Sequence, residues 1–343
     1  MSGTTRAAVL AEPRRFEIAD QPTPRPGRGE ALVRVAATAV CHTDLAIYTG
    51  RHPGVRYPVV LGHEAAGVVE AVGADVRIAV GTRVVINPII ACGACDCCER
   101  GHENLCRRAG LLGREMNGSL SEHLTLPERY LHPLPDGIPL DAATLIETLA
   151  TVRHAQQRAR VVPGSAVVVL GQGATGLFHT RLAKLSGASP VIAVSRTAWK
   201  RDLARRMRAD TAVDPSAGDL AAQVLALTDG LGADLVIETS GDPALVRPAI
   251  DMLRPGGTLL FYAISHEPVP NFTIFPMYFK ELTLVGTRAL LPADFAPAIR
   301  LVARGDVTLD GLITASYPLD EAAAAFGEYE RAPERVLRLL IVS

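Results

Sequence analysis

The hydrophobic pattern of the chain changes near residue 140. Before that point, short runs rich in valine and alanine are separated by turns that contain glycine and proline, and these runs cover 6–10, 31–39, 66–72 and 83–86. Short runs with this spacing and punctuation are typical of strands in all-β structures. We therefore expect a barrel-like β region that carries loops in the first part of the chain.

After residue 140, continuous apolar runs alternate with segments of helical spacing. The expected strands cover 166–170, 191–194, 234–238, 257–263, 282–286 and 336–342, and the expected helices cover 141–160, 174–187, 197–208, 243–253 and 295–304. Strands that alternate with helices predict βαβ units and a parallel sheet. The predicted fold class is α/β, with a β-rich region beside a doubly wound parallel sheet.

Composition limits the classes of partner. The chain has 343 residues, enough for two domains, and a formal net charge of −1. A chain without a basic excess has no electrostatic field that attracts nucleic acid or a membrane surface. No apolar run approaches the roughly 18 residues of a membrane span, and no signal segment is recognisable. We expect a soluble protein of the cytoplasm.

Four closely spaced cysteines lie in the loop-like stretch 91–107, namely Cys92, Cys95, Cys98 and Cys106. Disulfides between such neighbours are rarely stable in a reducing cytoplasm, and the stretch lacks the apolar periodicity of a core. A compact set of four thiols closes a tetrahedron around Zn²⁺. We therefore predict a structural zinc lobe. Cys97 is expected to be a free thiol, but its place beside Cys98 leaves open which of the two is the ligand.

A second set of metal ligands is widely spaced and mixed in type. It comprises Cys41, in the run Cys41-His42-Thr43-Asp44, and the pair His63-Glu64. Cysteine, histidine and carboxylate ligands together leave a coordination position for substrate, as catalytic zinc sites do. The two sets predict an enzyme with one structural and one catalytic zinc, two per chain.

A glycine-rich motif follows a buried apolar run and opens a helix pattern. It reads Gly171-Gln172-Gly173-Ala174-Thr175-Gly176. Gly171 permits a tight turn, Gly173 lets the backbone approach a pyrophosphate, and Gly176 lets helix and strand pack closely. The amides of Ala174 and Thr175, at the helix N-terminus, are suited to bind phosphate. This context predicts a dinucleotide site.

The end of the next expected strand indicates which nicotinamide cofactor binds. An NAD site places a carboxylate there for the ribose hydroxyls. This chain has Ser195-Arg196 instead, and no acid until Asp202. A hydroxyl and a guanidinium suit a 2′-phosphate, and Lys200 and Arg201 add positive charge nearby. We predict NADP as the cofactor, with NAD as the alternative.

The order of these motifs resembles that of the zinc-dependent medium-chain alcohol dehydrogenases. Cys41, the run Gly62-His63-Glu64-x-x-Gly67, the cysteine lobe and the glycine-rich motif follow one another as in that family. The resemblance implies a GroES-like catalytic domain interrupted by a Rossmann domain, with the active site in the cleft between the domains. The limits expected are 1–152 and 291–343 for the first domain and 153–290 for the second.

One segment resembles the polyol and threonine dehydrogenase branch of this family. The segment 145–150, followed by His154, corresponds to a stretch that reads Glu-Pro-Leu-Ala in the branch. The branch places its glutamate on or near the catalytic zinc, which makes Glu147 an expected ligand, direct or through water. Thr148 stands where the branch has proline.

The resemblance also assigns the other residues around the catalytic zinc. Cys41 and His63 match its firm ligands, and Glu64 matches a carboxylate behind the zinc that ligates it transiently. Asp44 is expected to accept a hydrogen bond from the second ring nitrogen of His63.

Two further residues match the proton path and the cofactor site of the family. Thr43 matches the hydroxyl that takes the substrate proton, and His42 matches a position that contacts the cofactor pyrophosphate. Many relatives pass the proton on through a histidine three residues after that hydroxyl, where this chain has Ala46. The proton leaves either through water or through another group such as His52.

These features together predict an enzyme. We expect an NADP-linked dehydrogenase that interconverts a secondary alcohol (of the polyol, cyclitol or amino-alcohol type) and its ketone by hydride transfer. The alternatives are a zinc-free quinone or enoyl reductase of the same fold and a non-catalytic NADP-binding protein, and the intact ligand sets argue against both. The stretch 280–287 resembles the edge strand that joins Rossmann domains, which implies a homodimer or homotetramer.

Overall fold

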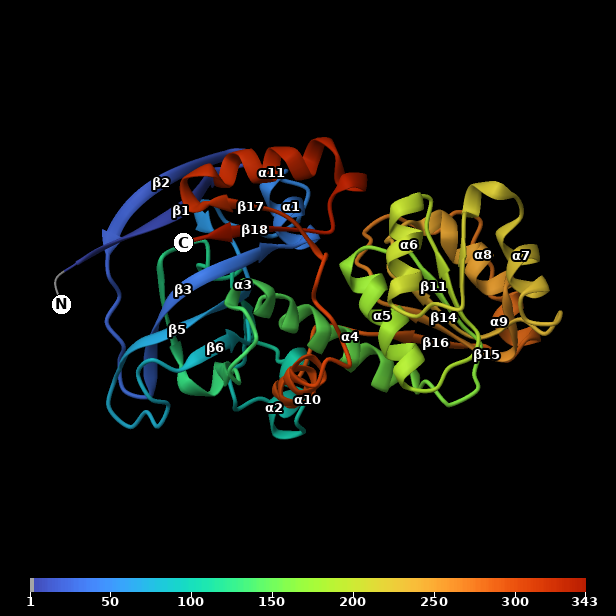
Figure 1. Cartoon of the computed structure of the whole chain (residues 1–343), viewed down its shortest axis with the longest axis horizontal. Coiled ribbons are helices and arrows are strands. Elements are labelled where there is room, and N and C mark those ends of the chain that lie inside the picture. Colours follow the sequence, from blue (N-terminus) through green and yellow to red (C-terminus); the bar gives the residue numbers. More distant parts are fainter. Residues whose placement is uncertain (1–2) are drawn as a thin grey trace. The chain divides into compact units, whose positions relative to one another are not determined.

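The computed structural model describes residues 3–343, and the chain forms two compact units. The first unit contains the residues up to Ala150 together with Leu290–Ser343, and the second contains Thr151–Ala289. In Figure 1 the first unit carries the blue and red ends of the colour scale, and the second carries the green-to-orange middle. Two segments that are distant in sequence therefore fold together in the first unit.

The first unit consists mainly of antiparallel strands. Its strands are β1 (Thr4–Glu12), β2 (Arg15–Pro22), β3 (Glu30–Val40), β4 (Val59–Val60), β5 (Glu64–Val72), β6 (Arg83–Ile86), β7 (Ile89–Ile90), β8 (Gly110–Leu111), β9 (His123–Pro127), β10 (Leu131–Pro133), β17 (Ile313–Pro318) and β18 (Arg338–Val342). Its helices are α1 (His42–Tyr48), α2 (Asp96–Glu99), α3 (Leu140–Ala143), α10 (Pro292–Ala303) and α11 (Ala322–Arg331), and α4 (Leu145–Ala159) continues from it into the second unit.

The largest sheet of the first unit joins early and late strands. Its order is β10-β6-β5-β3-β18-β17, with β9 also paired to β3, and a smaller sheet has the order β2-β1-β4. β18 pairs with β3 on one side and with β17 on the other. Because β5 also pairs with β3, residues at the start of β5 and of β18 are brought to the same part of the sheet.

The second unit is a parallel α/β structure. It contains β11 (Val167–Leu170), α5 (Ala174–Leu185), β12 (Val191–Val194), α6 (Ala198–Arg206), β13 (Thr211–Val213), α7 (Leu220–Ala226), β14 (Ala233–Glu238), α8 (Val246–Asp251), β15 (Leu253–Phe261), α9 (Phe275–Phe279) and β16 (Thr283–Gly286). The sheet order is β13-β12-β11-β14-β15-β16, and all pairs are parallel. This is the order of a Rossmann fold, in which the direction of winding reverses between the first and fourth strands.

Side chains of β11 alternate between two hydrophobic cores. Val168 and Leu170 pack in a core with residues of α7 and α8, whereas Val167 and Val169 pack in a core with Ala155 of α4 and residues of α5. A strand covered on both faces reads as a continuous apolar run rather than as an alternating one. The central strand is therefore apolar throughout, as the sequence showed.

The structure contains elements that the hydrophobic pattern did not indicate, among them β2, α7, α11, β13 and β17. β2 has an exposed or half-buried side chain at each position, so it lacks a buried apolar face. α11 begins with four alanines, which favour a helix by propensity rather than by apolar periodicity. Among residues 3–343, no helix is both long and apolar enough to cross a lipid bilayer.

Candidate active site

A buried aspartate organises the residues around Cys41 and His63. Asp44 lies on α1, directly after β3, and is 1% exposed. Its Oδ2 accepts a hydrogen bond from the backbone N–H of Cys41 (2.9 Å), and its Oδ1 accepts one from the N–H of Gly62 (3.2 Å). The same Oδ1 lies 3.2 Å from Nδ1 of His63, as expected from the sequence. The contact leaves Nε2 of the ring for a metal ion.

The Asp44 carboxylate also raises the pKa of His63. Burial lowers the pKa of His63, but the adjacent charge of Asp44 outweighs it, so the net pKa lies well above the usual range of histidine.

The turn before His63 requires glycine. Gly62 has a φ of 96°, and a Cβ there would lie 2.7 Å from Cγ2 of Thr38 and 2.8 Å from Oγ of Ser119. A side chain is excluded both by this backbone conformation and by its neighbours. The glycine therefore lets the chain enter β5 with His63 against Asp44.

Cys41, between β3 and α1, lies close to the adjacent residues His63 and Glu64, where β5 begins. Each offers one ligand atom, and these atoms lie within 4.8 Å of one another. A thiol, an imidazole and a carboxylate are the donor types that bind Zn²⁺ in catalytic sites. The chemistry of this donor set fits the metal that the sequence led us to expect.

Glu147 lies in the first turn of α4 and is 6% exposed. It is outside the group formed by Cys41, His63 and Glu64. Burial raises the pKa of Glu147 to about 8, and the negative charge of Glu64 contributes to the same shift. Two carboxylates thus share a buried region, and the positive charges of His63 and Arg338 offset part of the pKa rise of Glu147.

A buried ion pair, which sequence reasoning missed, fixes Glu64. Arg338 of β18 donates from Nε (2.9 Å) and Nη2 (3.0 Å) to the two carboxylate oxygens of Glu64, and the two residues are 4% and 2% exposed. Nη2 also lies 3.5 Å from Oγ1 of Thr148, the residue that replaces the proline of the branch.

A signal for this pair was present in the sequence. Arg338 is the one charged residue of the apolar run 336–342. A charge in a buried strand needs a partner of opposite sign. The sequence could not show which acid that partner is, because Glu64 is 274 positions away.

The residues expected in the proton path and at the pyrophosphate lie on or next to α1. His42 is exposed, and its Nδ1 is 2.7 Å from the hydroxyl of Tyr329. Thr43 is half-buried beside Asp44. His52, a candidate for the proton path, has its Nδ1 2.9 Å from the carbonyl oxygen of Pro53.

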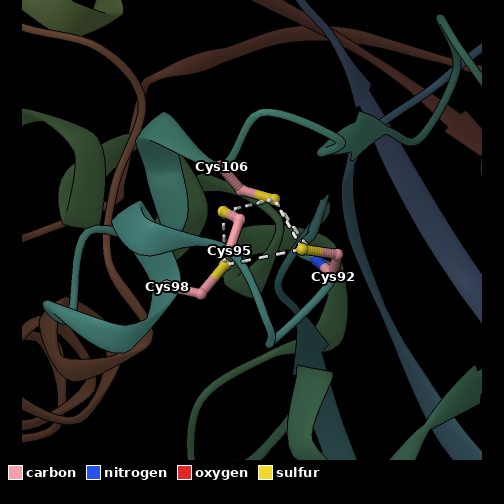
Figure 2. Close-up of side chains that lie close together, drawn as sticks. All are labelled: Cys92, Cys95, Cys98 and Cys106. Atoms are coloured by element: carbon pink, nitrogen blue, oxygen red, sulfur yellow. Dashed lines mark hydrogen bonds between the residues drawn. The ribbon is translucent and has the colours of Figure 1, made fainter.

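The four predicted lobe cysteines form a compact cluster, shown in Figure 2. The sulfur atoms of the neighbouring pairs are 3.4 to 4.0 Å apart. Four sulfurs bound to one Zn²⁺ at ~2.3 Å are about 3.8 Å apart, from the geometry of a tetrahedron. Backbone N–H groups of Cys92 and Arg108 also point to the sulfur of Cys106, each at 3.4 Å. The cluster is Cys92, Cys95, Cys98 and Cys106, and Cys97 is outside this set of four.

The glycine-rich loop has the conformation that phosphate binding requires. Gly171 has a φ of 89°, and a Cβ on Gly176 would lie 2.0 Å from the carbonyl oxygen of Gly171. At Gly173 an added Cβ would meet no atom within 4 Å, so the backbone is open there. Gly173 is the N-cap of α5, whose first residues are Ala174 and Thr175. The loop therefore offers open backbone and a helix N-terminus to a pyrophosphate.

Gln172, the second residue of the motif, turns inward. It is 2% exposed, its Nε2 donates to the carbonyl oxygen of Val169 (3.1 Å), and its Oε1 accepts from the hydroxyl of Thr180 (3.1 Å). The loop is thus anchored to the strand before it and to the helix after it.

The residues expected at the adenosine ribose lie at the end of β12. Ser195 is 8% exposed, Arg196 is exposed, and Lys200 is half-buried, with its ammonium 5.3 Å from the ring centroid of Trp199. In this segment the chain thus presents an exposed guanidinium and no carboxylate, as the sequence indicated.

Two protein families match this chain. The alcohol dehydrogenase GroES-like domain matches residues 27–136, and the zinc-binding dehydrogenase family matches residues 174–304. L-galactonate-5-dehydrogenase of Escherichia coli is 33% identical over 94% of each chain, and sorbitol dehydrogenase of Halalkalibacterium halodurans is 33% identical over 91% of each chain. A solved chain from Sinorhizobium meliloti, described as a zinc-binding dehydrogenase bound to NADP, is 32% identical, covers 99% of this chain and 100% of its own length, and has a TM-score of 0.93.

Proposed function

This chain belongs to the zinc-dependent medium-chain alcohol dehydrogenases, in their polyol-dehydrogenase-like branch. We propose that it interconverts a secondary alcohol and its ketone, with two zinc ions per chain and NADP as the cofactor. It is an oxidoreductase of the alcohol dehydrogenase type that acts on an alcohol or its ketone. The observation that carries the proposal is the convergence of Cys41, His63 and Glu64, whose ligand atoms lie within 4.8 Å of one another.

The catalytic zinc is held, in this proposal, by Cys41 and His63, with Glu64 and Glu147 as the carboxylates nearby. Zinc bound there would act as a Lewis acid on an alcohol or ketone oxygen, and the oxidised nicotinamide would accept the hydride. Asp44 orients His63 and holds Nδ1, so that Nε2 is the ligand atom. Arg338 donates to both carboxylate oxygens of Glu64, and either Glu64 or Glu147 completes the ligand set in this proposal.

Thr43 is proposed to take the alcohol proton. Its hydroxyl is two residues from Cys41 on the same turn of chain, and a hydroxyl both accepts and donates a proton. Ala46 offers no group for the next transfer, and Nδ1 of His52 faces the carbonyl oxygen of Pro53. We therefore assign the further path of the proton to water.

NADP is proposed as the cofactor because the ribose end of the site lacks an acid. Ser195 and the exposed Arg196 stand where an NAD site has a carboxylate, and Lys200 is close in sequence. The pyrophosphate is assigned to Gly171, Gly173, Ala174, Thr175 and Gly176, with His42 as a further contact.

The substrate class follows from the branch. L-galactonate-5-dehydrogenase and sorbitol dehydrogenase are named for substrates with several hydroxyl groups. We therefore propose a polyol or a related compound, such as a cyclitol or an amino alcohol, as the secondary alcohol. Intact ligand sets at both zinc sites argue against a zinc-free reductase and against a non-catalytic protein.

The proposal is tested by a substrate panel on zinc-loaded protein. We expect oxidation of at least one vicinal diol, sugar alcohol, cyclitol or amino alcohol with NADP, and reduction of its ketone with NADPH. A matched panel of quinones and enones should give no turnover. Turnover of those compounds by metal-free protein, with none of the alcohols oxidised, would refute it.

We also propose that the protein assembles through β16. This strand ends the sheet and pairs only with β15 among the described residues, and the neighbouring α9 exposes an apolar face that we call the α9 face. Its residues are each at least 64% exposed, namely Ile274, Phe275, Tyr278 and Phe279. Exposed edge strands and apolar patches of this kind mark interaction surfaces, which supports a homodimer or a homotetramer.

A further inference from the structure

Arg201 of α6 connects the ends of two neighbouring strands. Its Nη1 donates to the carbonyl oxygens of Ser195 (2.7 Å) and Arg196 (3.0 Å), directly after β12. The same nitrogen is 2.8 Å from Oδ2 of Asp214, the residue after β13. One guanidinium therefore joins both carbonyls of the Ser195–Arg196 segment to a carboxylate directly after the adjacent strand.

Both ends of this connection are fixed by further contacts. The N–H of Ser195 donates to the carbonyl oxygen of Val213 (3.1 Å), and the hydroxyl of Ser195 accepts from the N–H of Thr197 (3.3 Å). Asp214 caps the short helical turn that follows, and its Oδ1 accepts from the N–H (2.9 Å) and the hydroxyl (2.6 Å) of Ser216. Asp214 is thus held in place as the partner of Arg201.

Arg201 and Arg196 face different surroundings. The side chain of Arg201 is 18% exposed and its charge is balanced by Asp214, whereas Arg196 is exposed. The guanidinium of Arg201 is therefore paired within the protein, whereas the guanidinium of Arg196 faces solvent. This differs from the simple expectation that Arg201 adds positive charge for the cofactor.

We propose that Arg201 is a positioning residue for cofactor choice: through Asp214 it holds Ser195 and Arg196 in the conformation that receives the 2′-phosphate. The inference rests on the proposed use of NADP. Holding a binding segment in its bound conformation strengthens binding, because less conformational entropy is lost when the ligand arrives. The effect is selective, since the 2′-phosphate meets this segment whereas the pyrophosphate, common to both cofactors, meets the glycine-rich loop.

The experiment is a fluorescence titration of NADPH and of NADH with the zinc-loaded enzyme and three variants. Arg201→Met and Asp214→Asn each remove one side of the connection. We expect both to weaken NADPH binding by about tenfold while NADH binding changes by less than about twofold. The control is Arg206→Met, which removes an exposed arginine from the same helix and should leave both affinities unchanged. Thermal unfolding of each variant shows whether it is folded.

The Asp214→Asn variant distinguishes a positioning role of Arg201 from direct contact between Arg201 and the 2′-phosphate. If Arg201 bound the 2′-phosphate itself, loss of the competing carboxylate would strengthen NADPH binding, and that result would overturn the inference. An unchanged ratio of NADPH affinity to NADH affinity in both variants would also overturn the inference. If the wild type still preferred NADPH in that case, the cofactor proposal would stand. A wild-type enzyme that binds NADH more tightly would instead refute the cofactor proposal before any variant is measured.

Discussion

Charged residues beside Cys41 and His63 are buried with partners. Asp44 faces His63 and two backbone N–H groups, and Glu64 faces Arg338. A buried charge that loses its partner costs several kcal/mol, so each of these contacts restricts the site to one arrangement. The contacts of Asp44 and Arg338 therefore fix the places of His63 and Glu64.

Thr43 provides the first prediction at this scale. Thr43→Val keeps the shape of the side chain but removes the hydroxyl that is proposed to take the alcohol proton. Loss of a group that transfers a proton lowers rates by about 10² to 10⁴-fold, and we expect kcat to fall within this range. Steady-state kinetics measure the effect, and zinc content and cofactor affinity should be unchanged. A variant with wild-type kcat would show that Thr43 has no part in proton transfer.

His132 provides a second prediction, on stability. The centroids of its ring and the Phe295 ring are 4.1 Å apart in a stacked pair. Its Nε2 has no hydrogen-bond partner among residues 3–343, and burial lowers the pKa of His132 to about 4. Because the pKa is lower in the folded chain than in the unfolded chain (about 6.5), protons bind preferentially to the unfolded chain below pH 6.5. Stability is therefore lost as the pH falls from about 6.5 towards 4.

We expect His132→Phe, which keeps a ring against Phe295, to lose less stability on acidification. Between pH 7 and pH 5 the difference should be on the order of 2 kcal/mol. Urea unfolding of both proteins at the two pH values measures it. Equal losses in the wild type and the variant would show that His132 is not buried in its neutral form.

At the scale of elements, the cysteine lobe and the glycine-rich loop were recognised because their spacing is local. Each motif has its functional residues within one short stretch of chain. In the structure, neighbouring sulfur atoms of the lobe are 3.4 to 4.0 Å apart, and the backbone at Gly173 is open. Elements without such a signal were missed. β2 lacks a buried face, and α11 is helical through its alanines.

The lobe also carries a prediction. Cys98→Ser removes one of four sulfurs and should release one zinc per chain, and it should lower the unfolding temperature by about 5 °C or more. Cys97→Ser is the matched control, since Cys97 is adjacent in sequence and lies outside the set of four. Metal analysis and thermal unfolding measure both effects. Loss of zinc in Cys97→Ser but not in Cys98→Ser would assign the ligand to Cys97.

At the scale of the whole molecule, the α/β class, the motif order and the family were accessible from sequence. Contacts between distant segments were not. The pair formed by Glu64 and Arg338 depends on β18 lying beside β3. The contact of Arg201 with Asp214 depends on the ends of β12 and β13 being adjacent. Sequence spacing carries no information on such neighbours, because they arise from the order of strands in a sheet.

Assembly is predicted at this scale as well. Leu284→Lys places a charge on β16, where Leu284 is 41% exposed, and we expect it to reduce the molar mass in solution from an oligomer towards the monomer. The control is Leu231→Lys, since Leu231 is 71% exposed but belongs neither to β16 nor to the α9 face. Light scattering after size exclusion measures both. A wild-type chain that is monomeric, or a Leu284 variant that stays oligomeric, would contradict assembly through β16.

The most direct test of the central claim is the zinc content of the protein, purified without chelator. We predict two zinc ions per wild-type chain and one in Cys41→Ala, with the remaining ion in the cysteine lobe. One zinc in the wild type, or two in the Cys41 variant, would contradict a catalytic zinc held by Cys41 and His63.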